Sequence, residues 1–424
     1  MNFKTKRRMI GAALLVAAVA LAATGCGAAK KASSGSTGSS GGNVTLKLVA
    51  ADYGSGPSNT SQTYWQDIAK AFHTANPTIT VKVQTINWND FDNQVQTMIQ
   101  NHQYVDITEG DYFSTYAQEG LLYSASDVLS KVGNLLPVFA KQGSYKGVQY
   151  GMPFTTSSRT LFYNKKLFAQ AGITSAPQTW TDIQADAAKI KALGKLGFGL
   201  PLGPEEAQGE TLLWFLGNGG GFQTASGQWD INSQPNVETF QFLQKLVSSG
   251  DTEPHPGTQN RTTLWKEFAQ GQIGMINGSP ALIPIIQQGG VLQKGDWASV
   301  AIAGKNSPLS NTLGVCDNVA AFKSNGHEAA IKKFLDFAYQ DKYQLQFDKE
   351  YDLLPATVSA AKALASDPIF GSFIKALPVS VQYPTSDTAW PQVRTQIQQT
   401  IGTAITGNPK SVLDTLQQTA KNGG

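Results

Sequence analysis

Residues 44–83 read VTLKLVAADYGSGPSNTSQTYWQDIAKAFHTANPTITVKV. Apolar and polar residues alternate from Val44 to Leu48, which is the period of a strand with one face more buried than the other. From Thr63 the apolar spacing becomes helical, and Asn76-Pro77 ends that helix. Alternation returns from Ile79 to Val83. A strand, a helix and a second strand in this order form a βαβ unit, which predicts parallel strands with helices packed on the sheet.

Helical patterns recur along the rest of the chain and give the whole sequence an α/β character. We expect helices from the capping box Thr181-Asp182-Ile183-Gln184 to about Leu193, and over residues 237–247, 327–340, 390–405 and 411–421. The folded part has about 380 residues, which is more than one hydrophobic core usually supports, so two domains are expected.

The N-terminus has the composition of an export signal. Basic residues precede an apolar run of 15 residues from Met9 to Ala23, which is shorter than the roughly 20 residues that a helix needs to cross a membrane. The small residues before Cys26 resemble the lipobox of bacterial lipoproteins. We therefore expect residues 1–25 to be a lipoprotein signal peptide and 26–43 to be a lipidated Cys26 with a flexible tether. An ordinary signal peptide followed by a coincidental Cys is the alternative.

The charge of the chain changes once that leader is removed. Four of the 33 basic residues and none of the 30 acidic residues lie in it, which leaves 29 basic against 30 acidic residues. Nucleic-acid-binding modules need a basic face, so nucleic acid is not an expected partner. Charged residues make up only 15% of the chain and aromatic residues 10%. Such a surface suits neutral, hydroxyl-rich ligands better than ionic ones.

Catalytic and metal-binding patterns are mostly absent from the sequence. The four histidines occur singly, without metal-ligand spacing, so we expect no metal and no other cofactor. The G-x-S-x-G match at residues 38–42 lies in the tether and cannot form a nucleophile elbow. Gly217–Gly221 lacks the last glycine of the dinucleotide fingerprint and is expected to be a loop. Cys316 has no His near it in sequence and is expected to be a small buried residue.

Aromatic residues interleaved with short polar ones are the pattern that points to a ligand. Sugars stack on aromatic rings, and carboxylates or amides bind their hydroxyl groups in a partly dry cleft. Candidates of this kind are Tyr53, Trp88, Glu109, Asp111, Tyr112, Trp214 and Trp390. Core packing is the alternative for each Trp, and we expect it for Trp65 and Trp180 at helix starts. We expect the Glu205-Glu206 pair to be a solvated loop charge.

Residues 147–180 carry a more specific resemblance. They contain GVQYGMPF at 147–154, LFYNKKLF at 161–168, AGI at 171–173 and PQTW at 177–180. Further matches lie at residues 65–77, 105–107, 116–122 and 268–278. Together these motifs resemble the family 1 extracellular solute-binding proteins of ATP-driven sugar importers, the group that includes maltose-binding protein. The resemblance covers essentially everything from Val44 onward.

This resemblance implies two discontinuous α/β lobes with a ligand cleft between them. The lobes would be joined by crossover segments near residues 153–157, 313–316 and 354–356. Lobe 1 would then comprise residues 44–156 plus 315–355, and lobe 2 residues 157–314 plus 356–424.

The same resemblance implies roles for several site residues. Asp111 occupies the place of an acid that binds sugar hydroxyls, with Tyr112 beside it, and Ser157 lies where the chain enters the second lobe. Trp390 matches an aromatic platform under a sugar ring. The sequence departs from the family where Ser157 replaces an acid and where residues 277–281 lack a Trp. These departures argue against simple maltodextrin specificity.

The resulting expectation is a substrate-binding lipoprotein of an ABC transporter rather than an enzyme. It would capture a mono- or oligosaccharide by lobe closure and deliver it to the membrane permease. It would act as a monomer, anchored through Cys26 on the outer face of the cytoplasmic membrane. A binding protein for another solute class, such as peptide or polyamine, and a secreted glycoside hydrolase are the alternatives.

Overall fold

The structure is a computed structural model that describes residues 42–53, 59–110 and 113–423. The leader, Cys26, Asp111 and Tyr112 lie outside the described residues. In the part of the chain that is described, no helix is long and apolar enough to span a membrane.

The expected βαβ unit is confirmed at the start of the fold. It consists of β1 (Val44–Asp52), α1 (Ser61–Ala75) and β2 (Ile79–Asn87), with β1 and β2 paired in parallel. The Thr60 hydroxyl caps α1 by accepting a hydrogen bond from the backbone N–H of Gln62, and Asn76 ends the helix. Along β1, Leu48 faces one hydrophobic core and Val49 faces another. Helices must therefore cover both faces of this sheet.

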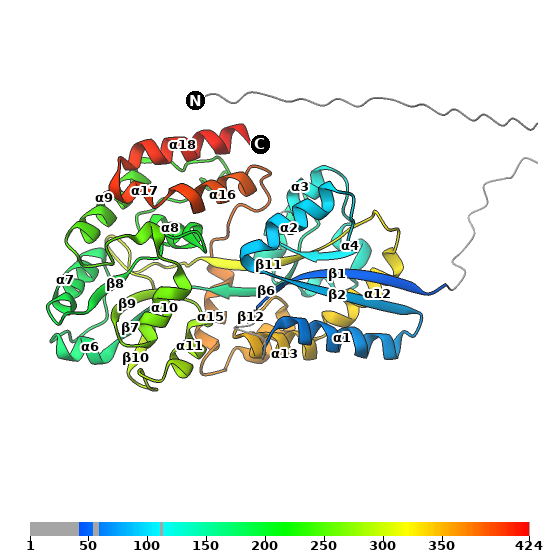
Figure 1. Ribbon diagram of the computed structural model, residues 1–424, viewed down its shortest axis with the longest axis horizontal. Coiled ribbons are helices and arrows are strands. Elements are labelled where there is room, and N and C mark those ends of the chain that lie inside the picture. Colours follow the sequence, from blue (N-terminus) through cyan, green and yellow to red (C-terminus); the bar gives the residue numbers. More distant parts are fainter. Residues whose placement is uncertain (1–41, 54–58, 111–112, 424) are drawn as a thin grey trace, which may run out of the picture. The chain divides into compact units, whose positions relative to one another are not determined.

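A six-stranded sheet with the order β12-β6-β11-β3-β1-β2 is the frame of the first lobe. The added strands are β3 (Ile107–Glu109), β6 (Met152–Ser158), β11 (Gly314–Ala321) and β12 (Leu354–Pro355). The helices of this lobe are α2 (Trp88–Gln100), α3 (Phe113–Gln118), α4 (Ala125–Val128), α5 (Pro137–Gln142), α12 (Glu328–Ala338) and α13 (Asp341–Tyr351), with the 3₁₀ turn η1 (Val132–Asn134) and the hairpin β4 (Ser144–Tyr145) and β5 (Val148–Gln149). Figure 1 shows α1 and α2 on opposite faces of the sheet.

A four-stranded sheet with the order β10-β7-β9-β8 is the frame of the second lobe. Its strands are β7 (Thr160–Asn164), β8 (Leu196–Gly199), β9 (Ile273–Gly278) and β10 (Trp297–Val300). Its helices are α6 (Lys165–Gln170), α7 (Trp180–Lys191), α8 (Ala207–Leu216), α9 (Gln234–Ser248), α10 (Arg261–Ala269), α11 (Leu282–Gly289), α16 (Trp390–Thr400), α17 (Thr403–Thr406) and α18 (Pro409–Asn422), with the 3₁₀ turn η2 (Pro256–Thr258). The alternation of strands and helices in both lobes confirms the α/β class.

The strands nearest the second lobe include the three segments expected to be crossovers. They fall on β6, β11 and β12, which are neighbours at one edge of the six-stranded sheet. A hydrophobic core that contains Cys316 and Leu354 from these strands also contains Phe162 and Ile276 from the second sheet. Helices α14 (Val358–Leu364) and α15 (Gly371–Ala376) and the turn η3 (Leu377–Val379) contribute to this joint. The expectation that Cys316 is buried is confirmed at 2% exposure.

Two expected helix boundaries need correction. The cap of α7 is Thr179 rather than Thr181, because Thr179 and Asp182 form the reciprocal capping box. The expected helix over 390–405 is divided into α16 and α17, with Gly402 between them. Gly402 packs directly against Gly257, and a Cβ there would lie 2.4 Å from the Gly257 Cα. The other expected helices and the loop at Gly217–Gly221 are confirmed within a few residues.

Candidate functional site

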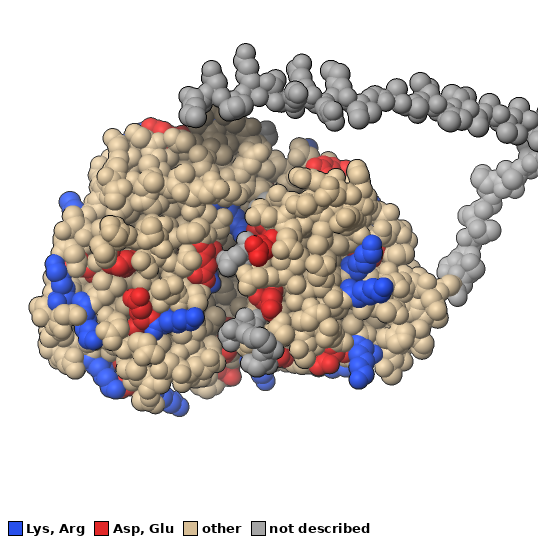
Figure 2. Space-filling view, viewed as in Figure 1, with Lys and Arg blue, Asp and Glu red and all other residues tan. Residues whose placement is uncertain are grey.

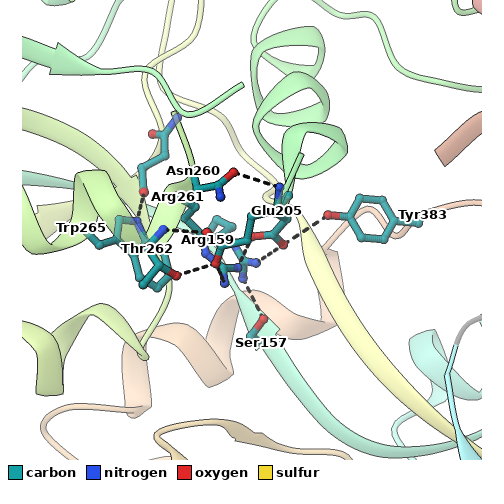
Figure 3. Close-up of polar contacts among 10 residues, drawn as sticks. Ser157, Arg159, Glu205, Asn260, Arg261, Thr262, Trp265 and Tyr383 are labelled. Carbon is teal, nitrogen blue, oxygen red and sulfur yellow. Dashed lines mark hydrogen bonds and ion pairs between the residues drawn. The ribbon is translucent and has the colours of Figure 1, made fainter. Parts of the chain in front are cut away.

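The junction between the two sheets carries a cluster of charged side chains (Figure 3). Strand β6 ends at Ser158, and Arg159 directly precedes β7, so the chain passes from one sheet to the other at this point. Glu205 and Glu206 come just before α8, and Arg261 is the first residue of α10. Three segments far apart in the sequence meet here. We call Arg159, Glu205, Glu206 and Arg261 the arginine–glutamate cluster.

Glu206 holds this cluster together. Its Oε1 lies 2.5 Å from Arg159 Nη2, and its Oε2 pairs with Arg261 Nη1. Arg159 Nη1 also donates to Ser157 Oγ at 2.7 Å, and Arg261 Nη2 lies 2.8 Å from Glu205 Oε1. Burial opposes ionisation of Glu206, but the charges of Arg159 and Arg261 outweigh it and lower the pKa to about 2. The Glu206 carboxylate is therefore ionised and neutralised by two guanidinium groups.

A small cavity opens beside the arginine–glutamate cluster. It is lined by Arg159, Pro201, Glu206, Glu210, Leu213, Arg261, Trp265 and Asn277. The Arg261 guanidinium lies over the Trp265 ring, 4.7 Å from its centroid. Glu210 accepts hydrogen bonds from Trp214 Nε1 at 2.7 Å and Asn277 Nδ2 at 2.9 Å, and burial raises its pKa to about 8. The cavity is lined by an aromatic side chain and by fixed hydrogen-bonding groups, and it has room for about one water molecule.

A second polar group lies on the first lobe. Tyr53 follows β1, Glu109 ends β3 and Asp317 lies in the middle of β11. The Tyr53 hydroxyl is 3.0 Å from Glu109 Oε1 and 3.0 Å from Asp317 Oδ2. Trp88, at the start of α2, meets the Tyr53 ring edge to face at 5.4 Å between centroids. We call Glu109, Tyr53 and Asp317 the carboxyl–tyrosine chain.

An ion pair connects the two lobes. Arg394 on α16 lies 2.8 Å from Asp92 on α2, and the two side chains are only 15% and 16% exposed. Helix α16 packs in the core of the second lobe through Trp390, whereas α2 packs on the first sheet through Phe91. Figure 2 shows a groove between the lobes, with acidic side chains on both of its sides. The charged groups described above therefore belong to two walls that face each other.

The structure brings together some of the expected site residues. Tyr53, Trp88 and Glu109 are in contact on the first lobe, and Ser157 is part of the polar junction through Arg159. Asp111 and Tyr112 lie outside the described residues, so their role stays a prediction.

The two remaining candidates, Trp214 and Trp390, are interior residues. Trp390 is 0% exposed and its ring stacks on Tyr383 at 5.2 Å, and Trp214 is 3% exposed and packs against Trp180. This arrangement differs from the expected aromatic platform, because a ring covered by its own lobe presents no free face to a sugar. The core positions expected for Trp65 and Trp180 are confirmed, at 2% and 3% exposure.

Several groove residues were missed by sequence reasoning. Glu205 and Glu206 were expected to be solvated charges, which is wrong, since both pair with arginines and the Glu206 side chain is 12% exposed. Three arginines, Arg159, Arg261 and Arg394, are also part of these charged groups and were not among the sequence candidates. The signal that could have revealed Arg159 is its position two residues after Ser157, a residue already placed at the crossover. Among the described residues, no group of acids, histidines or cysteines has the geometry of a metal site.

Comparison with known proteins identifies the family. Residues 67–372 match the family model described as bacterial extracellular solute-binding protein. A diacetylchitobiose-binding protein of Streptomyces coelicolor is 26% identical over 82% of this chain and 82% of its own length. An sn-glycerol-3-phosphate-binding periplasmic protein of Brucella melitensis is also 26% identical, over 58% of this chain and 59% of its own.

A solved structure supports the same fold. An ABC transporter solute-binding protein of Thermotoga lettingae, determined with bound alpha-D-tagatose, aligns with a TM-score of 0.76 and 20% identity. The alignment covers 89% of this chain and 99% of that protein. The expected fold class, two α/β lobes joined by crossover segments, is thereby confirmed.

Proposed function

The chain belongs to the bacterial extracellular solute-binding proteins, and we propose that its solute is a sugar. A mono- or oligosaccharide is captured between the lobes and delivered to the membrane permease of an ATP-driven importer. Ligand contacts on both walls stabilise the closed form, and the permease recognises that form. The protein carries out no reaction of its own in this process.

The pairing of charges in the groove is the observation that carries this proposal. Arg159 and Arg261 are neutralised by Glu205 and Glu206, and Arg394 by Asp92. An anionic solute would have to compete with buried carboxylates for these guanidinium groups. A sugar needs no free countercharge, because its hydroxyl groups bind to carboxylate and guanidinium groups that are already paired.

The solutes named for similar proteins are a second reason to propose a sugar. The Streptomyces relative is named for diacetylchitobiose and the Thermotoga structure holds alpha-D-tagatose, which are both uncharged. The Brucella relative is named for an anionic solute, sn-glycerol 3-phosphate. The paired charges of the groove favour an uncharged solute over an anionic one. Peptides and polyamines are the alternative solutes.

The two lobes are assigned by the positions of the crossovers. We propose residues 44–156 plus 315–355 for lobe 1 and residues 157–314 plus 356–424 for lobe 2. The membership of the strands in two separate sheets supports this division. Closure would bend the chain near Arg159, where β6 leads into β7.

Attachment to the membrane follows from the leader sequence. We propose that a lipid on Cys26 anchors the mature, monomeric protein to the outer face of the cytoplasmic membrane. An anchored receptor stays within reach of its permease, and a doubly acylated residue is enough for stable attachment. Mass spectrometry of the mature N-terminus tests this, since a Cys26→Ala protein should lose both lipid and membrane fraction.

The solute is tested by a thermal-shift screen of the mature protein with mono- and oligosaccharides. A ligand that binds only the folded state raises the unfolding temperature, and the rise grows with the logarithm of the ligand concentration once this exceeds the dissociation constant. Diacetylchitobiose, laminaribiose and D-tagatose are suitable first probes, with sn-glycerol 3-phosphate, a dipeptide and a polyamine as competitors. A shift with a sugar is expected. A shift with sn-glycerol 3-phosphate, the dipeptide or the polyamine alone would contradict the proposal.

A further inference from the structure

The carboxyl–tyrosine chain contains one hydrogen too few for its geometry if both acids are ionised. The Tyr53 hydroxyl oxygen is 3.0 Å from an oxygen of Glu109 and 3.0 Å from an oxygen of Asp317. A phenol has a single O–H, so it can donate to only one of them. The other contact would then join two electron-rich oxygens in a buried place, which is unfavourable. One of the two carboxyl groups must therefore carry a proton and donate it to Tyr53.

The surroundings indicate that the proton is on Glu109. Glu109 is 2% exposed, whereas Asp317 is only partly buried. The backbone N–H of Ala51 donates to Glu109 Oε2 at 2.7 Å, which leaves Oε1 to donate to Tyr53. Tyr53 then donates its own hydrogen to the Asp317 carboxylate. Each donor has one acceptor in this arrangement, and none is left over.

The charges around the carboxyl–tyrosine chain agree with a proton on Glu109. Burial, followed by the charge of Asp317, raises the pKa of Glu109 to about 8. Burial also raises the pKa of Asp317, to about 6. At neutral pH this leaves Glu109 protonated and Asp317 ionised.

Other titratable and charged groups face the two acids from the surrounding elements. Tyr64 on α1 and Tyr339, which directly follows α12, face Glu109, and Asp92 on α2 lines the same small cavity as Glu109. Glu206, Arg394 and Arg159 act on Asp317 from the second lobe and from the junction. The two cationic groups already have carboxylate partners in Glu206 and Asp92. None of these groups replaces Glu109 as the proton donor to Tyr53.

We infer that Glu109, Tyr53 and Asp317 act as one recognition unit, in which Glu109 keeps a proton and Tyr53 holds the ionised Asp317 as an acceptor for a hydroxyl group of the solute. This inference rests on the proposed function, because it specifies the solute as a hydroxyl donor without negative charge. Asp317 is the ligand-binding residue of the unit. Glu109 and Tyr53 are positioning residues that act through it.

The unit makes solute binding depend on pH in a defined direction. Above about pH 8, Glu109 loses its proton, Tyr53 can no longer satisfy both acids, and the two negative charges repel each other. Below about pH 6, Asp317 becomes protonated and is a weaker acceptor. Affinity should therefore be highest between these values. One proton is involved at each end of this pH range. The affinity for the solute should therefore fall by at most about tenfold per pH unit, both on the acidic limb below pH 6 and on the alkaline limb above pH 8.

The test measures the dissociation constant of the wild-type protein by calorimetry from pH 5 to pH 10. The probes are diacetylchitobiose, laminaribiose and D-tagatose, with sn-glycerol 3-phosphate as the anionic probe. Glu109→Gln keeps a neutral donor to Tyr53 and an acceptor for Ala51 but has no proton to lose, so its affinity for sugar should not fall as the pH rises above about 8. Asp317→Asn should weaken sugar binding about tenfold or more at neutral pH through loss of a charged hydrogen bond.

Two further variants distinguish a change in the recognition unit from a general loss of folded structure. Tyr53→Phe removes only the bridging hydroxyl and should weaken binding while leaving both acids in place. Asp186→Asn is the matched control, because Asp186 is an acid with a raised pKa on the outer helix α7 and should leave the pH profile unchanged. Carboxyl carbon NMR of the wild type, compared with Glu109→Gln, should show a resonance that titrates near pH 8.

The outcomes separate this inference from the proposed function. A sugar that binds with an alkaline limb absent from Glu109→Gln supports the inference. A sugar that binds with a flat profile, or an alkaline limb that persists in Glu109→Gln, overturns the inference and leaves the proposed function standing. If no sugar binds at any pH, or if sn-glycerol 3-phosphate binds more tightly than every sugar, both are overturned.

Discussion

On the second lobe, Glu206 is buried between two guanidinium groups, whereas on the first lobe Glu109 is buried beside another acid and a tyrosine. The pKa of Glu206 falls to about 2 and that of Glu109 rises to about 8, although both side chains are almost inaccessible to solvent. Burial opposes ionisation in both places. The difference lies in the neighbours, since countercharges overcome burial at Glu206 while the charge of Asp317 adds to it at Glu109.

The two walls should therefore respond differently to a change of pH. The arginine–glutamate cluster keeps the charge of Glu206 across the whole physiological range. The carboxyl–tyrosine chain changes its proton content near pH 6, at Asp317, and again near pH 8, at Glu109. One wall of the groove has a fixed electrostatic character, and the other has a character that depends on a single proton.

Removing the countercharge should give the largest effect. Glu206→Gln keeps the size of the side chain but leaves the Arg159 guanidinium, which is 6% exposed, without its carboxylate. Breaking a buried ion pair from one side costs about 3–5 kcal/mol. We expect a loss of that size in the free energy of unfolding, measured by urea denaturation of the ligand-free protein at pH 7.

A solvent-exposed ion pair provides the control for this variant. Glu238→Gln breaks the pair with Lys305, in which the side chains are 39% and 43% exposed. Exposed pairs contribute little to stability, so no measurable change is expected. If Glu206→Gln were as mild as Glu238→Gln, the contrast between the two walls would not rest on buried charge.

The fold could be read from the sequence because its signals are local. The βαβ unit at 44–83 follows from a change of apolar period, and its helix ends at Asn76-Pro77 as the sequence predicts. The errors are local as well. Thr179 and Thr181 both precede an acidic or amide residue at capping distance, and only the backbone geometry of the structure selects Thr179.

The groove was harder to predict, because its residues acquire their roles from distant partners. Glu206 is separated from Arg159 by 47 residues and from Arg261 by 55, and nothing in the sequence near Glu206 indicates either arginine. Asp317 meets Tyr53 across 264 residues. The burial of Trp390 was also beyond the local sequence, which fits an aromatic platform, because that burial depends on Tyr383 and Phe222. The role of a side chain that depends on tertiary contacts cannot be predicted from the local sequence pattern.

The ion pair between the lobes allows a test of whether the two walls act together. Arg394→Met removes the charge that faces Asp92 and keeps much of the apolar stem, so helix α16 should stay in place. We expect the open form to gain population and sugar affinity to fall about tenfold, which is within the usual range of coupling between sites. Calorimetry gives the affinity, and small-angle scattering gives the radius of gyration without ligand.

A double-mutant cycle isolates this pair from the other contacts of Arg394. Asp92→Asn and the double variant complete the cycle, and a coupling energy of about 1–2 kcal/mol is expected. Within the described residues, Asp92 and Arg394 form the ion pair that joins α2 to α16. If the effects of the two substitutions on sugar affinity were purely additive, the walls would close independently of this pair.

The smallest effect should appear in the pH dependence of stability, and its sign separates the two walls. The folded protein holds the Glu109 proton up to about pH 8, whereas an unfolded chain releases it near the ordinary pKa of 4.5. The folded state therefore binds more protons between these values, and its stability decreases as pH rises through that window. Glu109→Gln has no proton to lose, so its stability should fall less steeply.

The difference in slope between the two proteins is limited to about 1.4 kcal/mol per pH unit, because one proton is involved. Urea denaturation from pH 7 to pH 8 measures it in a range where Asp317 is already mostly ionised. Glu253 and Glu210 also have raised pKa values, but they contribute equally to both proteins and cancel in the comparison. Parallel slopes would show that Glu109 is ionised in the folded protein. The first wall would then bury two adjacent negative charges, and a countercharge among its neighbours, rather than a shared proton, would have to stabilise it.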